Sequence, residues 1–209
     1  MNKTAQKRTA VRTLRRALRR TLCAAAILVA GILEPSTVGA QAPPQPAAAT
    51  ANPASAWLRN AYRSNGNYLA RTAEKLPEDL YAMRPGTQTE VRTLGQIIGH
   101  VVNFNFLWCS QAQGEPNPAK GRDFEKDASK ATLVAGLNEA LTYCNTTYAA
   151  LTDASGLETL QITQEDGRQT QALRLSLLVL NYGHNNEHYG NLVTMMRMKN
   201  IVPPSSEPR

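Results

Sequence analysis

Apolar residues recur at helical spacing in four segments of the chain. The segments cover residues 56–75, 93–111, 129–152 and 171–200. In each of them apolar side chains return every three or four residues, which places them on one face of a helix. The intervening stretches show no clear alternation of apolar and polar residues, so no strand is predicted. The pattern predicts an all-α fold, a four-helix bundle.

Each predicted helix has one stripe that should face the core. The fourth stripe differs from the others because it carries two histidines and an asparagine among aliphatic residues. The four stripes are Leu58, Tyr62, Leu69 and Ala73; Leu94, Ile97, Val101, Phe104 and Trp108; Leu133, Leu137, Leu141, Cys144, Tyr148 and Leu151; and Leu173, Leu177, Leu180, His184, His188, Asn191 and Met195.

Local signals indicate where the helices begin and end. Ser55 is the expected N-cap of the first helix, and Thr93 with Gln96 has the spacing of a capping box at the second. A polar loop at 164–169 separates the third helix from the fourth, and Pro203-Pro204 prevents the fourth from continuing.

The first forty residues predict a secretory signal peptide. Basic residues precede an apolar run from Leu22 to Leu33, and small residues up to Ala40 suit cleavage there. The run has about twelve residues, whereas a helix that crosses a bilayer needs roughly twenty. We therefore expect export by the general or the twin-arginine route, a periplasmic or secreted mature protein, and no membrane partner after cleavage.

Loss of the signal peptide changes the charge of the protein. Residues 1–40 hold 8 of the 23 Lys and Arg but one of the 16 acidic residues, which leaves 15 of each sign. A neutral balance offers no basic surface for a phosphate backbone, so no nucleic acid partner is expected.

Residues 41–54 are uncharged and rich in Pro and Ala, which predicts a disordered lead-in. Residues 55–204 then form one domain, followed by a tail at 205–209. Bundles of this size often form homodimers.

The chain has three histidines, and their placement predicts a metal site. His184 and His188 are four residues apart, so on a helix their Cβ atoms lie about 5–6 Å apart on one face. His100 lies on the core stripe of a second helix. Three neutral imidazoles with one open coordination position are typical of catalytic Zn²⁺, and the same nitrogen set accepts Ni²⁺ or Co²⁺. The alternative is three ordinary core histidines, which would cost about 1–3 kcal/mol for each unmade hydrogen bond.

Residues 184–188 also match the H-x-x-E-H string of inverted zinc peptidases. Those enzymes need a further carboxylate ligand from a downstream helix, and only 21 residues follow here, with Glu207 in a Pro-rich tail. Glu187 is nevertheless the candidate catalytic residue. It is expected either to accept a hydrogen bond from a ligand histidine, or to assist a metal-bound water, or to be an ordinary solvated helix residue.

Other residues are candidates for supporting roles near the histidines. Cys109 and Cys144 remain after signal cleavage, and an even pair in an oxidising compartment predicts a disulfide, with two buried thiols as the alternative. Asn103 and Asn181 each lie three residues from a predicted ligand. Phe104, Trp108 and Tyr62 are interpreted as core residues or as the lining of a pocket above the metal.

Over residues 56–204 the sequence resembles the DinB (DinB/YfiT-like) family of metalloenzymes. The residues that carry the resemblance are Glu74-Lys75-Leu76-Pro77, Arg84-Pro85, Gly95 to His100, His184, His188, Gly190, Met196-Arg197 and Pro203-Pro204. Asn191 departs from the family pattern, in which Gln is more usual. The resemblance implies a four-helix bundle with a metal site formed by His100, His184 and His188, and the family includes thiol-dependent S-transferases and isomerases.

Three functions are consistent with these observations. The first is a metal-dependent enzyme that activates water or a small-molecule substrate, by hydrolase or transferase chemistry. Thiol transfer is the less favoured version because small thiols are a cytoplasmic resource. The second is a non-catalytic metal- or ligand-binding bundle, and the third is a structural bundle without metal.

Overall fold

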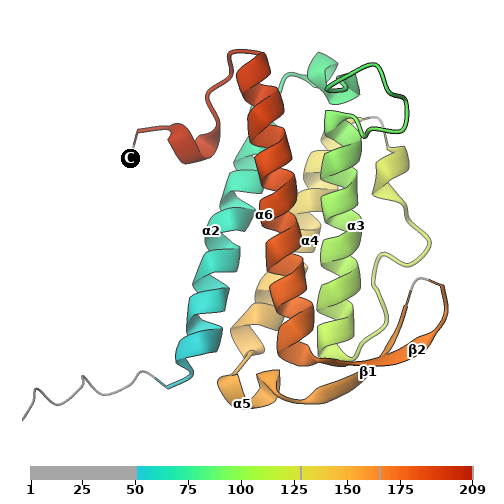
Figure 1. The fold of residues 1–209 in the computed structure, drawn as a ribbon, viewed down its shortest axis with the longest axis vertical. Helices are drawn as coiled ribbons and strands as arrows, with labels where there is room; N and C mark the ends of the chain where they lie inside the picture. The colour runs from blue at the N-terminus through green and yellow to red at the C-terminus, as the bar shows by residue number, and fades with distance from the viewer. Residues whose placement is uncertain (1–50, 128, 165, 209) are drawn as a thin grey trace, which may run out of the picture. The chain divides into compact units, whose positions relative to one another are not determined.

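The computed structural model describes residues 51–127, 129–164 and 166–208. The predicted signal peptide at 1–40 and most of the predicted lead-in lie outside the described residues. Four long helices run side by side (Figure 1): α2 (Pro53–Lys75), α3 (Leu94–Gln113), α4 (Lys130–Ala150) and α6 (Arg174–Met198). The prediction of an all-α four-helix bundle is confirmed. No described helix has both the length and the apolarity needed to cross a bilayer.

Helix α3 packs against α4 and α6, and α2 packs against the same two helices. Helices α3 and α4 run in the same direction, because residue 109 lies beside residue 144 and residue 95 beside residue 133. The connection between them therefore returns along the bundle, and it contains the short helix η2 (Phe124–Lys126), which packs on α3 (Figure 1). Another short helix, η1 (Glu78–Ala82), precedes α3.

Between α4 and α6 the structure contains a short helix and a hairpin that the sequence pattern did not predict. Helix α5 (Asp153–Gly156) is followed by the antiparallel strands β1 (Thr159–Thr163) and β2 (Gln169–Leu173), with Leu160 opposite Ala172. The expectation of no strand was wrong. The strands were missed because each has only five residues and little apolar surface. Helix α6 begins at Arg174 and not near residue 171, since residues 169–173 belong to β2.

The predicted stripes of the first and third helices are fully buried, whereas the fourth is partly wrong. Leu173, Leu180 and Asn191 are exposed, and Leu180 keeps 55% of its surface. The core face of α6 instead includes Asn181 and Asn185, both 0% exposed. Leu177, His188 and Met195 are buried as predicted. Apolar spacing alone does not identify asparagines as core residues, so the predicted stripe was displaced from the core face.

Two predicted ends also differ from the structure. Helix α2 begins at Pro53, and Ser55 is a buried residue of its first turn instead of the N-cap. The predicted tail folds back, with η3 (Pro204–Ser206) and a Glu207 carboxylate that accepts from Lys75 Nζ at 2.5 Å. The capping box of Thr93 and Gln96 is present as predicted.

Candidate metal centre

The three histidines meet between two neighbouring helices. His100 lies in the first half of α3, and His184 and His188 lie one turn apart on α6. One ring nitrogen from each histidine lies within 4.8 Å of the other two. His100 and His188 are 9% and 8% exposed, and His184 is half-buried. The structure therefore brings together all three residues that were predicted from the sequence to be ligands.

The spacing of the ring nitrogens suits a shared ion. The Nε2 atoms of His184 and His188 are 3.1 Å apart. Two nitrogens that each lie about 2.0–2.1 Å from one tetrahedral Zn²⁺ are separated by roughly 3.3 Å. Three imidazoles at such distances form a nitrogen donor set that fits Zn²⁺ or Ni²⁺.

Glu125 orients the first histidine. Its Oε1 lies 2.5 Å from His100 Nδ1, and its Oε2 accepts from Arg92 Nε at 2.8 Å. Burial raises the pKa of Glu125, but the hydrogen bonds with Arg92 and His100 outweigh burial and lower the pKa overall. An ionised carboxylate that accepts the Nδ1 proton leaves the Nε2 lone pair of His100 for a metal.

The segment that carries this carboxylate fits closely against α3 and α4. A Cβ on Gly99 would collide with the Phe124 carbonyl, and a Cβ on Gly136 would collide with the Phe124 ring. Asn103 secures the segment, because its Oδ1 accepts from Phe124 N at 3.0 Å and its Nδ2 donates to Asp123 at 2.9 Å. The two glycines thus permit the approach that places the carboxylate beside His100. Asn103, suggested from sequence as a supporting residue, thus bonds to the Phe124 backbone and to the Asp123 side chain of the segment that carries Glu125.

The two histidines of α6 are neutral at neutral pH. Burial, followed by the nearby His188 and His100, lowers the pKa of His184 to about 3. Burial, followed by His100, lowers the pKa of His188 to about 4, although Glu187 acts in the opposite direction. Metal ions bind the unprotonated ring, so both histidines are in the form that ligation requires.

The second nitrogen of each α6 histidine has a different environment. The Asn191 amide lies 3.4 Å from His188 Nδ1, so this exposed side chain contacts a predicted ligand. His184 Nδ1 is buried and has no hydrogen-bond partner among the described residues. Buried polar atoms are normally paired, and an ion bound at His184 Nε2 would leave this Nδ1 unpaired as well, so the unpaired atom does not distinguish a metal site from ordinary core histidines.

Aromatic residues pack on the histidines, and a cavity lies beside them. Phe104 lies 4.6 Å from His100 and 5.0 Å from His184 between ring centroids, and Trp108 meets His184 edge-on at 4.9 Å. A cavity of about 440 Å³ is lined by His188 together with polar and apolar residues. The other lining residues are Pro85, Glu90, Val91, Arg92, Ile97, Glu187, Asn191, Thr194 and Met195. The candidate catalytic residue Glu187 is exposed at this cavity.

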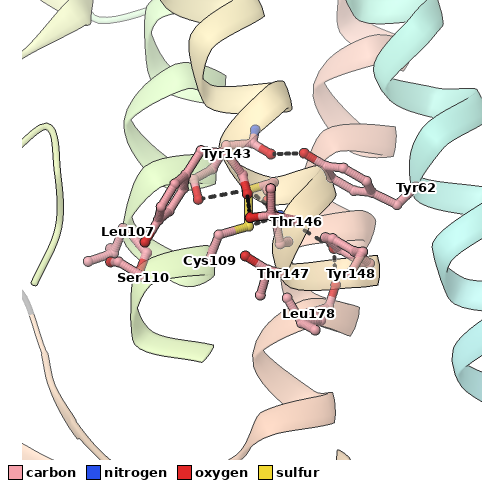
Figure 2. Close-up of a disulfide and its surroundings, with 12 residues drawn as sticks. Tyr62, Leu107, Cys109, Ser110, Tyr143, Thr146, Thr147, Tyr148 and Leu178 are labelled. Atoms are coloured by element: carbon pink, nitrogen blue, oxygen red, sulfur yellow. Dashed lines mark hydrogen bonds between the residues drawn. A yellow bond between two sulfur atoms is a disulfide. The ribbon is translucent and has the colours of Figure 1, made fainter. Parts of the chain in front are cut away.

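Two residues suggested from sequence lie away from the centre. Tyr62 stacks on Tyr148 in the core, with ring centroids 3.9 Å apart (Figure 2). Asn181 Nδ2 lies 3.4 Å from the Cys109 sulfur and 3.4 Å from the Tyr148 hydroxyl. Both residues therefore belong to the surroundings of the disulfide.

Figure 2 shows the disulfide between Cys109 of α3 and Cys144 of α4. Both cysteines are 0% exposed, and their Cα atoms are 5.4 Å apart. The structure supports the predicted pairing. Neither sulfur is therefore a ligand of the histidine site.

Sequence reasoning missed Glu125 and Arg92. No spacing along the chain relates residue 125 to residue 100, because their contact depends on how the 114–129 connection returns along α3. Arg92 directly precedes the capping box, where the sequence offers no sign that its side chain reaches a carboxylate 33 residues later. Only the three-dimensional arrangement identifies these two residues.

Comparison with known proteins assigns the chain to a family. The model of the DinB superfamily matches residues 61–192, so the protein belongs to this superfamily. No functionally curated protein matches the sequence. A DinB-like protein from Bacillus cereus ATCC 10987 is 16% identical, with a TM-score of 0.56 over 70% of this chain and 93% of that one.

Two further solved structures are similar. The DinB-like protein YjoA from Bacillus subtilis is 18% identical, with a TM-score of 0.56 over 73% of this chain and 99% of that one. The colibactin self-resistance protein ClbS, solved in complex with a double-stranded DNA, is 13% identical, with a TM-score of 0.49 over 68% and 95% of the two chains. The likeness to the two DinB-like proteins shows the fold alone, and the absence of a nucleic acid partner stays a prediction.

Proposed function

We propose that this protein is a metal-dependent enzyme in which His100, His184 and His188 hold one divalent ion, Zn²⁺ or Ni²⁺. The observation that carries the proposal is the convergence of three ring nitrogens within 4.8 Å, in a chain with three histidines. A structural bundle without metal does not explain why one ring nitrogen from each of the three histidines shares one point. Such an ion would supply Lewis-acid activation of water or of a small substrate.

The residues around the histidines would have different roles in such a site. Glu125 holds His100 in the required tautomer, and Arg92 holds Glu125. Phe104 and Trp108 cover part of the imidazole surface and keep water from it. The cavity of about 440 Å³ beside His188 is in the size range of small-molecule sites, and it is the proposed substrate pocket.

Glu187 is the proposed general base. Its carboxylate is exposed at the cavity, one residue before His188, and can receive a proton from a reacting group there. The choice between hydrolase and transferase chemistry depends on what enters the cavity. The buried disulfide and the proposed export of the protein support an oxidising compartment, which favours chemistry without a free small thiol.

Elemental analysis of the purified protein tests metal binding directly. We expect one equivalent of Zn²⁺ or Ni²⁺ in the wild type and less than about a tenth of that in His184→Ala, since that substitution removes one of three ligands. Asn145→Ala, an exposed change on α4, is the control and should retain the metal. A wild-type protein without metal that also takes up neither ion would contradict the proposal.

A second measurement separates an enzyme from a non-catalytic metal-binding bundle. The metal-loaded and metal-free proteins are assayed with a panel of esters and thiol acceptors, and their thermal unfolding is recorded. Metal-dependent turnover supports the enzyme. A large loss of thermal stability on metal removal, without turnover of any compound, supports a structural role for the ion.

A further inference from the structure

A reciprocal pair of buried amides joins the two helices that carry the histidines. Asn105 Nδ2 of α3 donates to Asn185 Oδ1 of α6 at 2.9 Å, and Asn185 Nδ2 donates back to Asn105 Oδ1 at 3.1 Å. Both side chains are 0% exposed. No other pair of side chains in the described residues has two hydrogen bonds running in opposite directions between α3 and α6.

Additional bonds fix the orientation of this pair. Asn105 Nδ2 also donates to the Val101 carbonyl one turn earlier, at 2.7 Å. Tyr62 of α2 donates its hydroxyl hydrogen to Asn105 Oδ1 at 2.9 Å. The Asn105 amide therefore uses both of its protons and accepts two, so it cannot rotate or shift without losing partners.

A buried amide pair is not an efficient way to stabilise a helix interface. An apolar pair of the same shape is about equal or better for stability, because the amides lose their bonds to water. What amides add is direction: buried asparagines between packed helices fix which residues lie opposite each other. Apolar contacts tolerate sliding by a fraction of a helical turn, whereas this doubly bonded pair does not.

The position of the pair connects it to the candidate metal centre. Asn185 directly follows His184, and Asn105 lies five residues after His100, about 7.5 Å along the axis of α3. Any slide of α3 along α6 would move His100 relative to both α6 histidines by the same amount. Metal–ligand distances vary by only about 0.2 Å, so a slide of one residue, about 1.5 Å, would break the site.

We propose that Asn105 and Asn185 are positioning residues that hold α3 and α6 in the register at which His100 faces His184 and His188. The inference rests on the proposed metal site, and it assigns these asparagines to ligand geometry and not to fold stability. Their removal should weaken metal binding while the metal-free protein stays folded.

The test variant is Tyr62→Phe/Asn105→Leu/Asn185→Leu. Leucine has as many side-chain heavy atoms as asparagine, and Tyr62→Phe avoids a buried hydroxyl without a partner. We expect helical content and cooperative unfolding of the metal-free protein to match the wild type. The affinity for Zn²⁺, measured by competition with a chelator, should fall about tenfold or more, as for other residues that orient ligands. The visible absorption of bound Co²⁺ should change as well, because it reports ligand geometry.

The matched control is Asn65→Leu/Asn186→Leu. Asn65 Nδ2 of α2 donates to Asn186 Oδ1 of α6 at 3.0 Å, so this is also an amide pair, but α2 carries no proposed ligand. The control should bind Zn²⁺ and Co²⁺ like the wild type. Unchanged affinity and Co²⁺ spectrum in a folded triple variant would overturn the inference.

If the triple variant does not fold, Asn185→Gln decides, since it keeps the amide but displaces it by one methylene. A tenfold loss of Zn²⁺ affinity supports the inference, and wild-type affinity overturns it. A wild-type protein that binds no Zn²⁺ in the same titration contradicts the metal site itself, and this result differs from a failure confined to the variants.

Discussion

Glu125 Oε1 lies 2.5 Å from His100 Nδ1, which makes a residue of the α3–α4 connection part of the candidate metal centre. The contact depends on the close fit of Phe124 against Gly99. The connection is therefore more than a link between helices, because it determines the tautomer and orientation of one proposed ligand.

Replacement of Glu125 by Gln should weaken metal binding about 10–100-fold, because the neutral amide stabilises the ligating imidazole less than a carboxylate does. Zn²⁺ competition with a chelator measures the loss. Glu158→Gln is the matched control, since Glu158 also pairs with an arginine, Arg174, but at the base of α6 and away from the histidines. Equal affinities of Glu125→Gln and the wild type would mean that Glu125 does not act on the ligand.

Gly99→Ala should reduce both stability and metal affinity. The added methyl group would collide with the Phe124 carbonyl, so the 114–129 connection must move away from α3. Overpacking of this kind costs about 1–3 kcal/mol in free energy of unfolding. Urea unfolding and the Zn²⁺ titration measure the two effects. Gly183→Ala, on an exposed position of α6 where a Cβ meets nothing within 4 Å, is the control. If Gly99→Ala loses stability but keeps the wild-type affinity for Zn²⁺, the packing of Phe124 does not control the orientation of His100.

Sequence periodicity was sufficient where one face of a helix is purely apolar. The α4 stripe from Leu133 to Leu151 is buried as predicted, because a single apolar face can be buried in only one way. The α6 stripe was displaced because Asn181 and Asn185 occupy core positions through partners on other helices. Local spacing along the chain does not show which distant polar groups will pair. The contact between Glu125 and His100 was not predicted for the same reason.

The metal-free protein should lose stability as the pH falls from 6.5 to about 4.5. Burial lowers the pKa of His184 to about 3 and that of His188 to about 4, against about 6.5 in the unfolded chain. The unfolded chain therefore binds more protons than the folded protein in this range, so the free energy of unfolding decreases as protons are added. Carboxylates with lowered pKa values contribute mainly at still lower pH.

Urea unfolding at several pH values measures this dependence. His184→Gln/His188→Gln removes both titrating groups and should show a shallower decrease between pH 6.5 and 4.5. The same slope in the wild type and in the double variant would contradict the assignment of the effect to these histidines.

Removal of the disulfide should lower the free energy of unfolding by about 3–4 kcal/mol on the chain-entropy model, because it frees a loop of 35 residues in the unfolded state. Denaturant unfolding of Cys109→Ala/Cys144→Ala measures the change. Reduction of the wild type should shift its unfolding midpoint in the same direction. Alkylation of both cysteines in the denatured protein before any reduction would show that the bridge is not formed.

Glu187→Gln tests the proposed general base with any substrate that the ester and thiol-acceptor panel identifies. Turnover should fall about 10²–10⁴-fold, because an amide cannot accept the proton that a carboxylate takes from the reacting group. Metal content and thermal stability should stay at wild-type values, since Glu187 is exposed and is not one of the three proposed ligands. The control is Glu139→Gln, an exposed glutamate of α4 that pairs with Arg122 outside the cavity. If Glu187→Gln retains full turnover, Glu187 is an ordinary solvated helix residue and the proton is taken by another group.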